Sequence, residues 1–220
     1  MNMTGHPFSR RAALRMVFSA AILSSLALPL ADATAQGANA ADLARIESYL
    51  NSIRTVQSRF LQVAASGDTA EGTLLIKRPG KLKLDYAPPA KQMILTTHDF
   101  VVYMDKEAKQ TSYQDLNSSL AGILVRSDIK LSGDIRVTNV SHAPGAIRVR
   151  LVLTKDPDAG SITLGFADQP LQLRQWTVVD PAGNSVDVTL MDAHFGVPVN
   201  DKEFEFIDPN SPVANQLRER

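Results

Sequence analysis

The chain contains no cysteine, which excludes structural disulfides, thiolate metal sites and a lipid anchor attached through cysteine. Aromatic residues make up only 6% of the chain, with a single tryptophan. Neither sign of charge is in excess, because 23 basic side chains face 23 acidic ones. This balance argues against a nucleic-acid partner, which would favour a basic surface.

The chain also lacks a hydrophobic run of the roughly 20 residues that a membrane-spanning helix needs. The apolar stretch 17–28 is shorter, and Pro29 ends it. A basic segment with Arg10-Arg11 precedes this stretch, and Ala33-Thr34-Ala35 follows it as an A-x-A cleavage site. The pattern predicts a cleaved secretory signal peptide over residues 1–35.

The predicted mature chain, residues 36–220, is expected to be one lipid-free domain in the periplasm, monomeric and without stable membrane insertion. It keeps 20 basic and 22 acidic side chains, a net charge of −2. Arg10-Arg11 resembles a twin-arginine signal, although Ala13 replaces the usual aromatic residue. The Sec and twin-arginine export routes therefore both stay open.

A helix is expected at the start of the mature chain. Leu43, Ile46, Leu50 and Ile53 recur at spacings of three and four residues, which is the pattern of one buried helical face. The spacing predicts a helix that starts with Asn39 or Asp42 as its cap.

From about Phe60 onward the hydrophobic period changes to two, which predicts β-strands. The candidate strands are Phe60–Ala65, Gly72–Arg78, Lys81–Tyr86, Lys91–Thr96, Phe100–Asp105, Lys109–Tyr113, Ile135–Val140, Ala146–Thr154, Ser161–Phe166, Leu171–Val179, Ser185–Met191 and Glu203–Ile207. The short turns between them favour antiparallel pairing. About eleven such strands curl into an incomplete antiparallel β-barrel.

One segment within this strand series lacks alternation. In residues 116–129, Leu120, Ile123 and Leu124 fall on one helical face, with Leu116 one turn earlier. This spacing predicts a second helix, which must lie across a face or the open mouth of the sheet. We expect it to act as a lid over an apolar cavity.

The chain offers little catalytic chemistry. The sequence contains no nucleophile elbow, phosphate-binding loop or dinucleotide fingerprint, and His98, His142 and His194 do not have the spacing of a zinc site. Residues 156–160 resemble the start of a calcium loop, but the downstream glutamate is missing and a turn explains them better. We therefore expect a binding protein without cofactor or metal, and not an enzyme.

The most distinctive segment is GTLLIKRPGKLKLDYAPP, residues 72–89. Leu74, Ile76 and Arg78 share one strand face before the Pro79-Gly80 turn. After the turn, Leu82, Leu84 and Tyr86 alternate with polar residues. This combination of a turn and two strand phases resembles the signature of the LolA family, the periplasmic carriers of outer-membrane lipoproteins.

The resemblance extends over nearly the whole mature chain. Residues 51–62, NSIRTVQSRFLQ, resemble the family's first helix running into a strand with the F-x-Q pattern. Residues 171–183 resemble its late strand and D-x-x-G turn, and Val197-Pro198 with Phe204-Glu205-Phe206 resemble its closing strand.

The resemblance implies that acylated lipoproteins are taken from an inner-membrane ABC transporter of the LolCDE type and passed to an outer-membrane lipoprotein receptor. It also implies that Arg78 couples the sheet to the lid and takes part in cargo transfer. Leu82 stands where the family usually has an aromatic residue, which leaves a smaller anchor. The structural alternative for Arg78 is a strand-end arginine that extends to water.

Residues from the sheet and the lid are predicted to form the functional site. Arg78, Leu82 and Leu84 are candidates for contact with cargo and lid. The predicted cavity lining comprises Leu74, Ile76, Tyr86, Leu120, Ile123 and Leu124. Trp176 and the tyrosines could also wall the cavity.

Three other functions remain as alternatives. The same cavity could serve a periplasmic binding module for another lipid, such as a hopanoid or a phospholipid. A regulatory module is a second alternative, because an envelope-stress regulator uses a similar domain together with an additional C-terminal one. A hydrolase is the third, and the missing nucleophile motif disfavours it.

Overall fold

The computed structural model describes residues 30–208, with side chains from Asn39 onward. Two elements are α-helices, α1 (Leu30–Ser52) and α2 (Gly122–Val125). The strands are β1 (Thr55–Ala64), β2 (Thr69–Lys77), β3 (Lys81–Tyr86), β4 (Gln92–Thr96), β5 (Phe100–Asp105), β6 (Gln110–Asp115), β7 (Ile135–Ala143), β8 (Ala146–Leu153), β9 (Ser161–Ala167), β10 (Gln172–Val179) and β11 (Ser185–Phe195). Two short 3₁₀ turns, η1 (Pro157–Ala159) and η2 (Asp201–Phe204), complete the structure.

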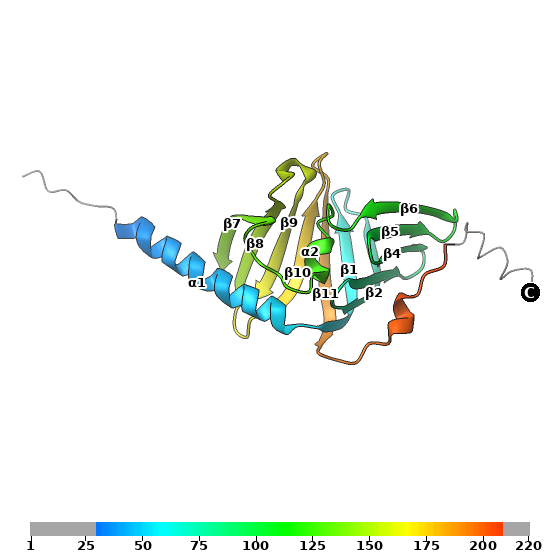
Figure 1. Cartoon of the computed structure of the whole chain (residues 1–220), viewed down its shortest axis with the longest axis horizontal. Helices are drawn as coiled ribbons and strands as arrows, with labels where there is room; N and C mark the ends of the chain where they lie inside the picture. The colour runs from blue at the N-terminus through cyan, green and yellow to red at the C-terminus, as the bar shows by residue number, and fades with distance from the viewer. Residues whose placement is uncertain (1–29, 209–220) are drawn as a thin grey trace, which may run out of the picture.

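All eleven strands form one open antiparallel sheet (Figure 1). The spatial order is β6-β5-β4-β3-β2-β1-β11-β10-β9-β8-β7, so the first and last strands pair at the centre of the sheet. The two edge strands, β6 and β7, follow one another along the chain. The expectation of a mainly β, incompletely closed sheet is confirmed.

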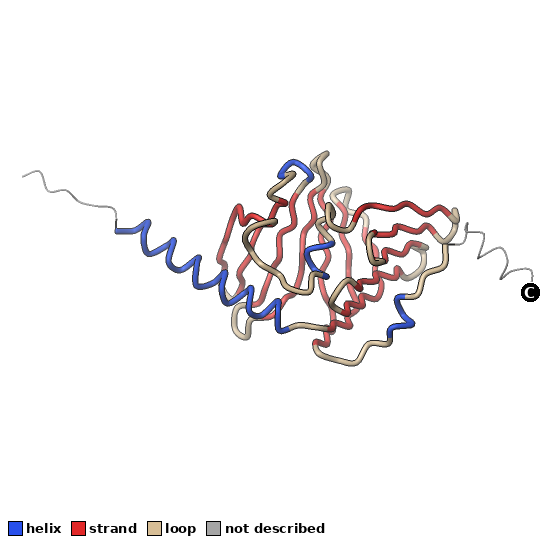
Figure 2. The backbone as a smooth tube through the Cα atoms, viewed as in Figure 1, coloured by secondary structure: helices blue, strands red, loops and turns tan. Residues whose placement is uncertain are grey.

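The helices and the connection between the edge strands lie on one face of the sheet, which we call the inner face (Figure 2). The connection comprises residues 116–134 and contains α2; we call it the lid segment. Apolar side chains alternate along strands such as β3 and the first part of β8, so one row of each is buried. The largest fully buried side chains of this core include Phe60, Phe166, Ile46, Leu74, Leu82, Ile123, Ile147 and Leu151.

Helix α1 packs across the lower ends of strands β8–β10, as drawn in Figure 1. The Tyr49 hydroxyl accepts a hydrogen bond from the Leu173 amide at 2.9 Å, and the Tyr49 ring meets Phe166 edge-on with ring centroids 6.0 Å apart. Asp42 bonds His142 at 2.7 Å on the β7–β8 hairpin. Side-chain contacts of Asp42 and Tyr49 therefore hold this part of the helix against the sheet.

The segment after β11 crosses the opposite, outer face of the sheet. Lys77 Nζ donates to the Val199 carbonyl at 3.1 Å and pairs with Asp201 at 3.0 Å, and Lys81 also bonds Asp201. The bonds from Lys81 and Lys77 hold the pKa of Asp201 below its ordinary value. The Tyr113 hydroxyl donates to Asp208 at 2.6 Å, so the segment spans from β2 to the edge strand β6.

Four sequence-based expectations need correction. Helix α1 does not begin at Asn39 or Asp42 but includes both, because the alanine-rich sequence before them continues the helix. Strand β1 begins at Thr55 instead of Phe60. The helix has already ended before Ile53, which belongs to the short connection between helix and strand. The remaining two errors concern Glu203–Ile207 and the lid segment.

Glu203–Ile207 is not a strand. Residues Asp201–Phe204 form the 3₁₀ turn η2, in which only Phe204 is buried. The Lys81 ammonium lies over the Phe204 ring, 5.9 Å from its centroid. The free edges of the sheet are at β6 and β7, so no strand edge is available for pairing at this place on the outer face. The alternation of Phe204 and Phe206 therefore reflects packing onto a sheet face.

The lid segment is mostly irregular, and its only α-helical part is the four-residue α2. The predicted helix over 116–129 is therefore wrong in extent, although Leu116, Leu120, Ile123 and Leu124 are buried. The predicted signal peptide, residues 1–35, lies outside the described residues except for 30–35, which extend α1.

Gly72 in β2 is a position where any side chain would clash. A Cβ atom there would lie 2.2 Å from the Asp85 carbonyl oxygen and 2.7 Å from the Phe60 ring. We expect Gly72→Ala to lower the free energy of unfolding by about 1–3 kcal/mol, since overpacking forces backbone and ring to move. Urea unfolding measures this, with Thr73→Ala as the neighbouring control; equal effects of the two substitutions would contradict the clash.

Candidate functional site

The lid segment crosses the inner face of the sheet from β6 to β7 (Figure 1). Its apolar side chains Ile123, Leu124, Val125 and Ile129 are buried against the core. The Gly80 amide, in the β2–β3 turn, donates to the Val125 carbonyl at 2.7 Å. Gly80 has a φ of +78°, which glycine adopts without strain and which lets the turn approach the lid.

Arg78 joins the sheet, helix α1 and the lid segment. Its guanidinium donates to the Leu50 carbonyl, to the Ile53 carbonyl at 3.0 Å, and to the Arg126 carbonyl at 2.7 Å. A fourth bond, 3.2 Å long, goes to the side-chain oxygen of Asn51. The planar five-donor group thus serves three elements at once.

These acceptors explain why an arginine is held here. The carbonyls of Leu50 and Ile53 lie at the C-terminal end of α1, where carbonyls lack partners within the helix and carry partial negative charge. Arg78 is only 7% exposed, so it does not extend into solvent. Burial and the nearby Arg54 lower the pKa of Arg78, and Asp128 partly offsets them.

Asn51 forms a second attachment of the lid. Its side-chain NH₂ donates to the Ile129 carbonyl at 2.8 Å, and its oxygen accepts from the Ile129 amide at 2.8 Å. Glu47, one turn earlier on α1, accepts from the Leu131 amide at 2.8 Å. Side chains of the last two turns of α1 therefore form hydrogen bonds with the backbone of the lid segment.

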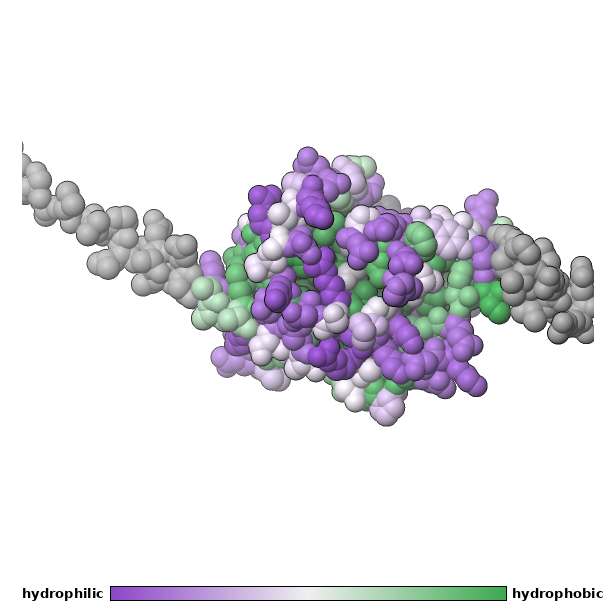
Figure 3. Space-filling model, in the orientation of Figure 1, coloured by the Kyte–Doolittle hydropathy of each residue, from purple (hydrophilic) through white to green (hydrophobic). Residues whose placement is uncertain are grey.

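An apolar cavity of about 440 Å³ lies between the lid segment and the inner face of the sheet. Leucines of β3 and of the lid, isoleucines and valines of β4, β9, β10 and β11, and the ring of Trp176 form most of its wall. The apolar residues of the wall are Leu82, Leu84, Ile94, Leu120, Ala121, Leu124, Ala159, Ile162, Trp176, Val178, Pro181, Val186 and Val188. In the space-filling view, hydrophobic residues show in recesses between polar side chains of this face (Figure 3).

Two tyrosines contribute to the cavity wall. The Tyr86 hydroxyl donates to the Gln62 side-chain oxygen at 2.6 Å, and its ring meets Phe60 edge-on at 5.1 Å. Burial is the main cause that raises the pKa of Tyr86 to about 12, with a further contribution from Tyr103. Burial likewise raises the pKa of Tyr103. Both phenols are therefore neutral at physiological pH.

The cavity adjoins a second hollow of about 570 Å³ on strands β4–β6. The two spaces share Gln92, Ile94 and Tyr103 as wall residues. Tyr103 is 39% exposed, and its hydroxyl has only a long contact of 3.4 Å with Gln114. Tyr103 therefore lies at the boundary of the two spaces.

The structure places the sequence-predicted site residues in three locations. Leu82, Leu84, Tyr86, Leu120 and Leu124 lie on the cavity wall. Leu74, Ile76 and Ile123 lie in the packed core, at 0%, 4% and 0% exposure. Arg78 lies at the lid attachment and not on the wall.

Sequence reasoning missed Asn51 and Glu47 as partners of the lid. Both are polar residues on α1, and their partners lie about 80 residues later in the chain. Their only signal in the sequence is their place in the last turns of the helix, beside the apolar stripe that faces the core.

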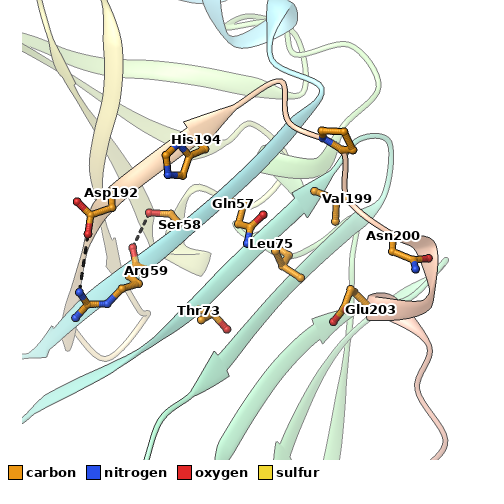
Figure 4. A pocket seen from close by; sticks show the side chains of 11 residues that line it. Gln57, Ser58, Arg59, Thr73, Leu75, Asp192, His194, Val199, Asn200 and Glu203 are labelled. Carbon is orange, nitrogen blue, oxygen red and sulfur yellow. Dashed lines mark hydrogen bonds and ion pairs between the residues drawn. The ribbon is translucent and has the colours of Figure 1, made fainter.

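A different hollow, of about 550 Å³, lies on the outer face beside the segment after β11 (Figure 4). It brings Ser58, Asp192 and His194 to one wall, which are the residue types of a catalytic triad. Ser58 is 3% exposed, and its hydroxyl donates to the carbonyls of Arg59 and Met191 at 2.6 and 2.9 Å. Asp192 pairs with Arg59 at 3.9 Å, so two of the three side chains are engaged elsewhere.

Asp192 explains the shape of this hollow. It has a φ of +53°, and the register of β1 against β11 shifts at this point, which marks a β-bulge.

Among residues 39–208, no three or more histidines, aspartates or glutamates gather as a metal-binding group would need. None of the helices in the described part of the chain has the length and hydrophobicity to cross a membrane.

Comparisons with known proteins identify a family. The family model "Outer membrane lipoprotein carrier protein LolA" matches residues 51–207. The outer-membrane lipoprotein carrier protein of Methylococcus capsulatus is 24% identical over 173 residues, covering 75% of this chain and 83% of that protein. The protein of the same name from Coxiella burnetii is 26% identical over 195 residues, covering 84% and 87%.

Among solved structures, the LolA superfamily protein NE2245 from Nitrosomonas europaea is similar, with a TM-score of 0.43 and 13% identity over 74% of this chain and 97% of that one. The family model spans most of the chain, including the last two residues of α1, the Arg78 turn, the lid segment and every strand. The chain is therefore a member of the LolA family.

Proposed function

We propose that this protein is a periplasmic carrier of outer-membrane lipoproteins. In this proposal it receives acylated lipoproteins from an inner-membrane ABC transporter, shelters their acyl chains in the cavity, and delivers them to an outer-membrane receptor. Membership of the LolA family and the names of its relatives support the cargo class. The observation that carries the proposal is the apolar cavity beneath a separately attached lid.

The energetics of acyl chains require such a cavity. Each buried CH₂ group contributes about 0.8 kcal/mol, so a chain of ~16 carbons is costly to expose, by about 12 kcal/mol. A wall of thirteen apolar residues, with Trp176 among them, offsets most of that cost. The lid supplies part of this wall through Leu120, Ala121 and Leu124.

In this proposal, loading opens the lid, because the closed cavity is small. A space of about 440 Å³ lies in the lower part of the ~300–1,000 Å³ range of ligand pockets, too small for three acyl chains together. Displacing the lid, or turning Tyr103 toward solvent, would add the neighbouring hollow. A closed empty state also lowers the apparent affinity, because cargo competes with lid packing, and this favours release.

A module for another lipid, such as a hopanoid or a phospholipid, is the alternative use of the same cavity. Binding assays with purified ligands distinguish these cases. The carrier proposal predicts that a triacylated lipopeptide binds and co-elutes with the protein in gel filtration. Retention of free lipids alone would reject the carrier role.

Filling the cavity tests where cargo binds. We expect Val178→Trp to lower lipopeptide affinity at least tenfold, because the new ring occupies space that the acyl chains need. The unfolding midpoint should change little, since the ring enters an existing void. Thr177→Trp is the matched control, because Thr177 lies on the outer face of the same strand, bonded to Asp187. Similar losses from both substitutions would place the cargo outside the cavity.

The delivery steps need a test in cells. Depletion of the protein should cause lipoproteins to accumulate at the inner membrane, and complementation with the wild-type gene should restore their delivery. Complementation by Val178→Trp should fail, whereas Thr177→Trp should restore delivery. Normal lipoprotein sorting in the depleted cells would reject the proposed function.

A further inference from the structure

The cavity wall carries polar groups as well as apolar ones, and these have a consistent chemical character. They are mainly amides and hydroxyls, contributed by Gln62, Gln92, Gln114, Ser118, Ser119 and Asn184. Of the 22 residues that line the cavity, none is lysine, arginine or histidine. Asp180 is the one charged residue among them.

The Gln62 amide is oriented to donate into the cavity wall. Because the Gln62 oxygen accepts from the Tyr86 hydroxyl, the NH₂ group of that amide remains for another acceptor. Gln92 and Gln114, on β4 and β6, are exposed beside the shared Tyr103 wall. Ester and amide carbonyls, which link acyl chains to a glyceryl-cysteine, are neutral acceptors that suit such donors.

Asp180 is held as a carboxylate in the β10–β11 turn. Its two oxygens accept from the backbone and side-chain nitrogens of Asn184, both at 2.8 Å. These bonds lower the pKa of Asp180 below its ordinary value. The negative charge therefore persists at the cavity wall over the physiological pH range.

A phosphate at this wall would meet a fixed like charge and no cation. An anion that leaves water needs a partner charge or several strong donors to offset its desolvation. Repulsion from a carboxylate at close range disfavours it further.

We propose that the cavity selects acylated head groups without a phosphate, and that Asp180 is a specificity-determining residue that excludes phospholipids. This inference rests on the proposed function, because it concerns the head group of the cargo that the same cavity binds. Neutral carbonyl-rich head groups bind at the amides, whereas anionic ones are rejected by charge.

Two short-chain ligands that differ only at the head group test this selection. Dioctanoylglycerol and dioctanoyl phosphatidic acid carry the same acyl chains, and only the second bears a phosphate. Displacement of a fluorescent apolar probe from the purified mature protein gives both affinities. We expect phosphatidic acid to bind at least tenfold more weakly than dioctanoylglycerol.

The substitution Asp180→Asn should reduce the ratio of the two affinities about tenfold. It should raise the affinity for phosphatidic acid and leave the affinity for dioctanoylglycerol unchanged. Asparagine keeps one oxygen to accept from the Asn184 amide, and a thermal unfolding scan checks that the turn survives. Asp187→Asn is the control, because Asp187 is an exposed carboxylate on β11 that points to the outer face.

The outcomes separate the two proposals. Equal binding of the two ligands by the wild-type protein overturns the selection, and an identical ratio in Asp180→Asn and Asp187→Asn overturns the role of Asp180. A triacylated lipopeptide, measured in the same assay, reports on the proposed function alone. If the lipopeptide fails to displace the probe, the carrier proposal is rejected whatever the ratio for the two lipids.

Discussion

Replacing Arg78 with methionine is expected to release the lid segment and to lower the free energy of unfolding by about 3–5 kcal/mol. Methionine keeps much of the buried aliphatic volume but has no donor. The carbonyls of Leu50, Ile53 and Arg126 would lose their shared partner inside the protein. The acceptors are main-chain groups at the end of α1 and in the lid segment, so no local rotamer change can satisfy them.

Hydrogen exchange distinguishes lid release from general destabilisation. The Ile129 and Leu131 amides bond to side chains of α1, so their exchange should accelerate far more than that of core amides such as Trp176. Binding of a hydrophobic dye should rise in parallel, as the cavity becomes accessible. Uniform acceleration across the sheet would instead show that Arg78 acts only on global stability.

Two further variants sharpen this test. Arg78→Lys keeps the charge but offers one compact ammonium, which cannot reach the acceptors on α1 and on the lid together. We therefore expect an intermediate loss of stability with most of the lid release. Arg59→Met is the control, because Arg59 pairs with Glu71 on the exposed outer face, and its loss should change stability by no more than about 0.5 kcal/mol.

Adjacent lid residues Ile123 and Leu124 are expected to respond differently to the same change. Leu124 faces the cavity, whereas Ile123 is fully buried in the packed core and does not line the cavity. Leu124→Ser removes about 2–3 kcal/mol of burial from the closed lid, so the empty protein should bind dye more strongly and take up cargo more easily. Ile123→Ser also places an unpaired hydroxyl in the core, so its unfolding midpoint should fall further.

Lipopeptide uptake and the unfolding midpoint, measured for both variants, decide between gate and core. A gate requires uptake to rise for Leu124→Ser and to fall for Ile123→Ser. If both variants unfold earlier and bind less lipopeptide, the segment contributes to the core alone. Leu120→Ser provides a second cavity-facing position, at 8% exposure, and should follow Leu124→Ser.

Strong alternation in the sequence predicted strand positions well. Lys81–Tyr86 has the predicted bounds, because a two-residue period with one apolar row fits only a half-buried strand. Phe100–Asp105 also has the predicted bounds, although Val101 and Val102 are both buried. The same reasoning failed for Glu203–Ile207. There the apolar spacing reflects how Phe204 packs on the outer face beside Lys81, which no local pattern encodes.

The lid shows a different limit of sequence reasoning. Its apolar spacing predicted a helix and correctly marked Leu120 and Leu124 as buried. Its backbone, however, forms hydrogen bonds with the side chains of Asn51 and Glu47 on α1. Such partners are distant in the chain, so helical spacing could not reveal them. The exposure of Arg78 was equally undetermined, since the acceptors that hold it are main-chain carbonyls with no side-chain signature.

The order of the strands has a mechanical consequence for the size of the load. The lid segment joins the two outermost strands, so it is a tether of fixed contour length between the free edges of the sheet. Fully extended, residues 116–134 span at most about 65 Å. A bulkier load would move the two edge strands apart and extend the lid segment. The strands could not separate further once this segment is fully extended. The length of one loop thus sets an upper bound on what the open sheet can enclose.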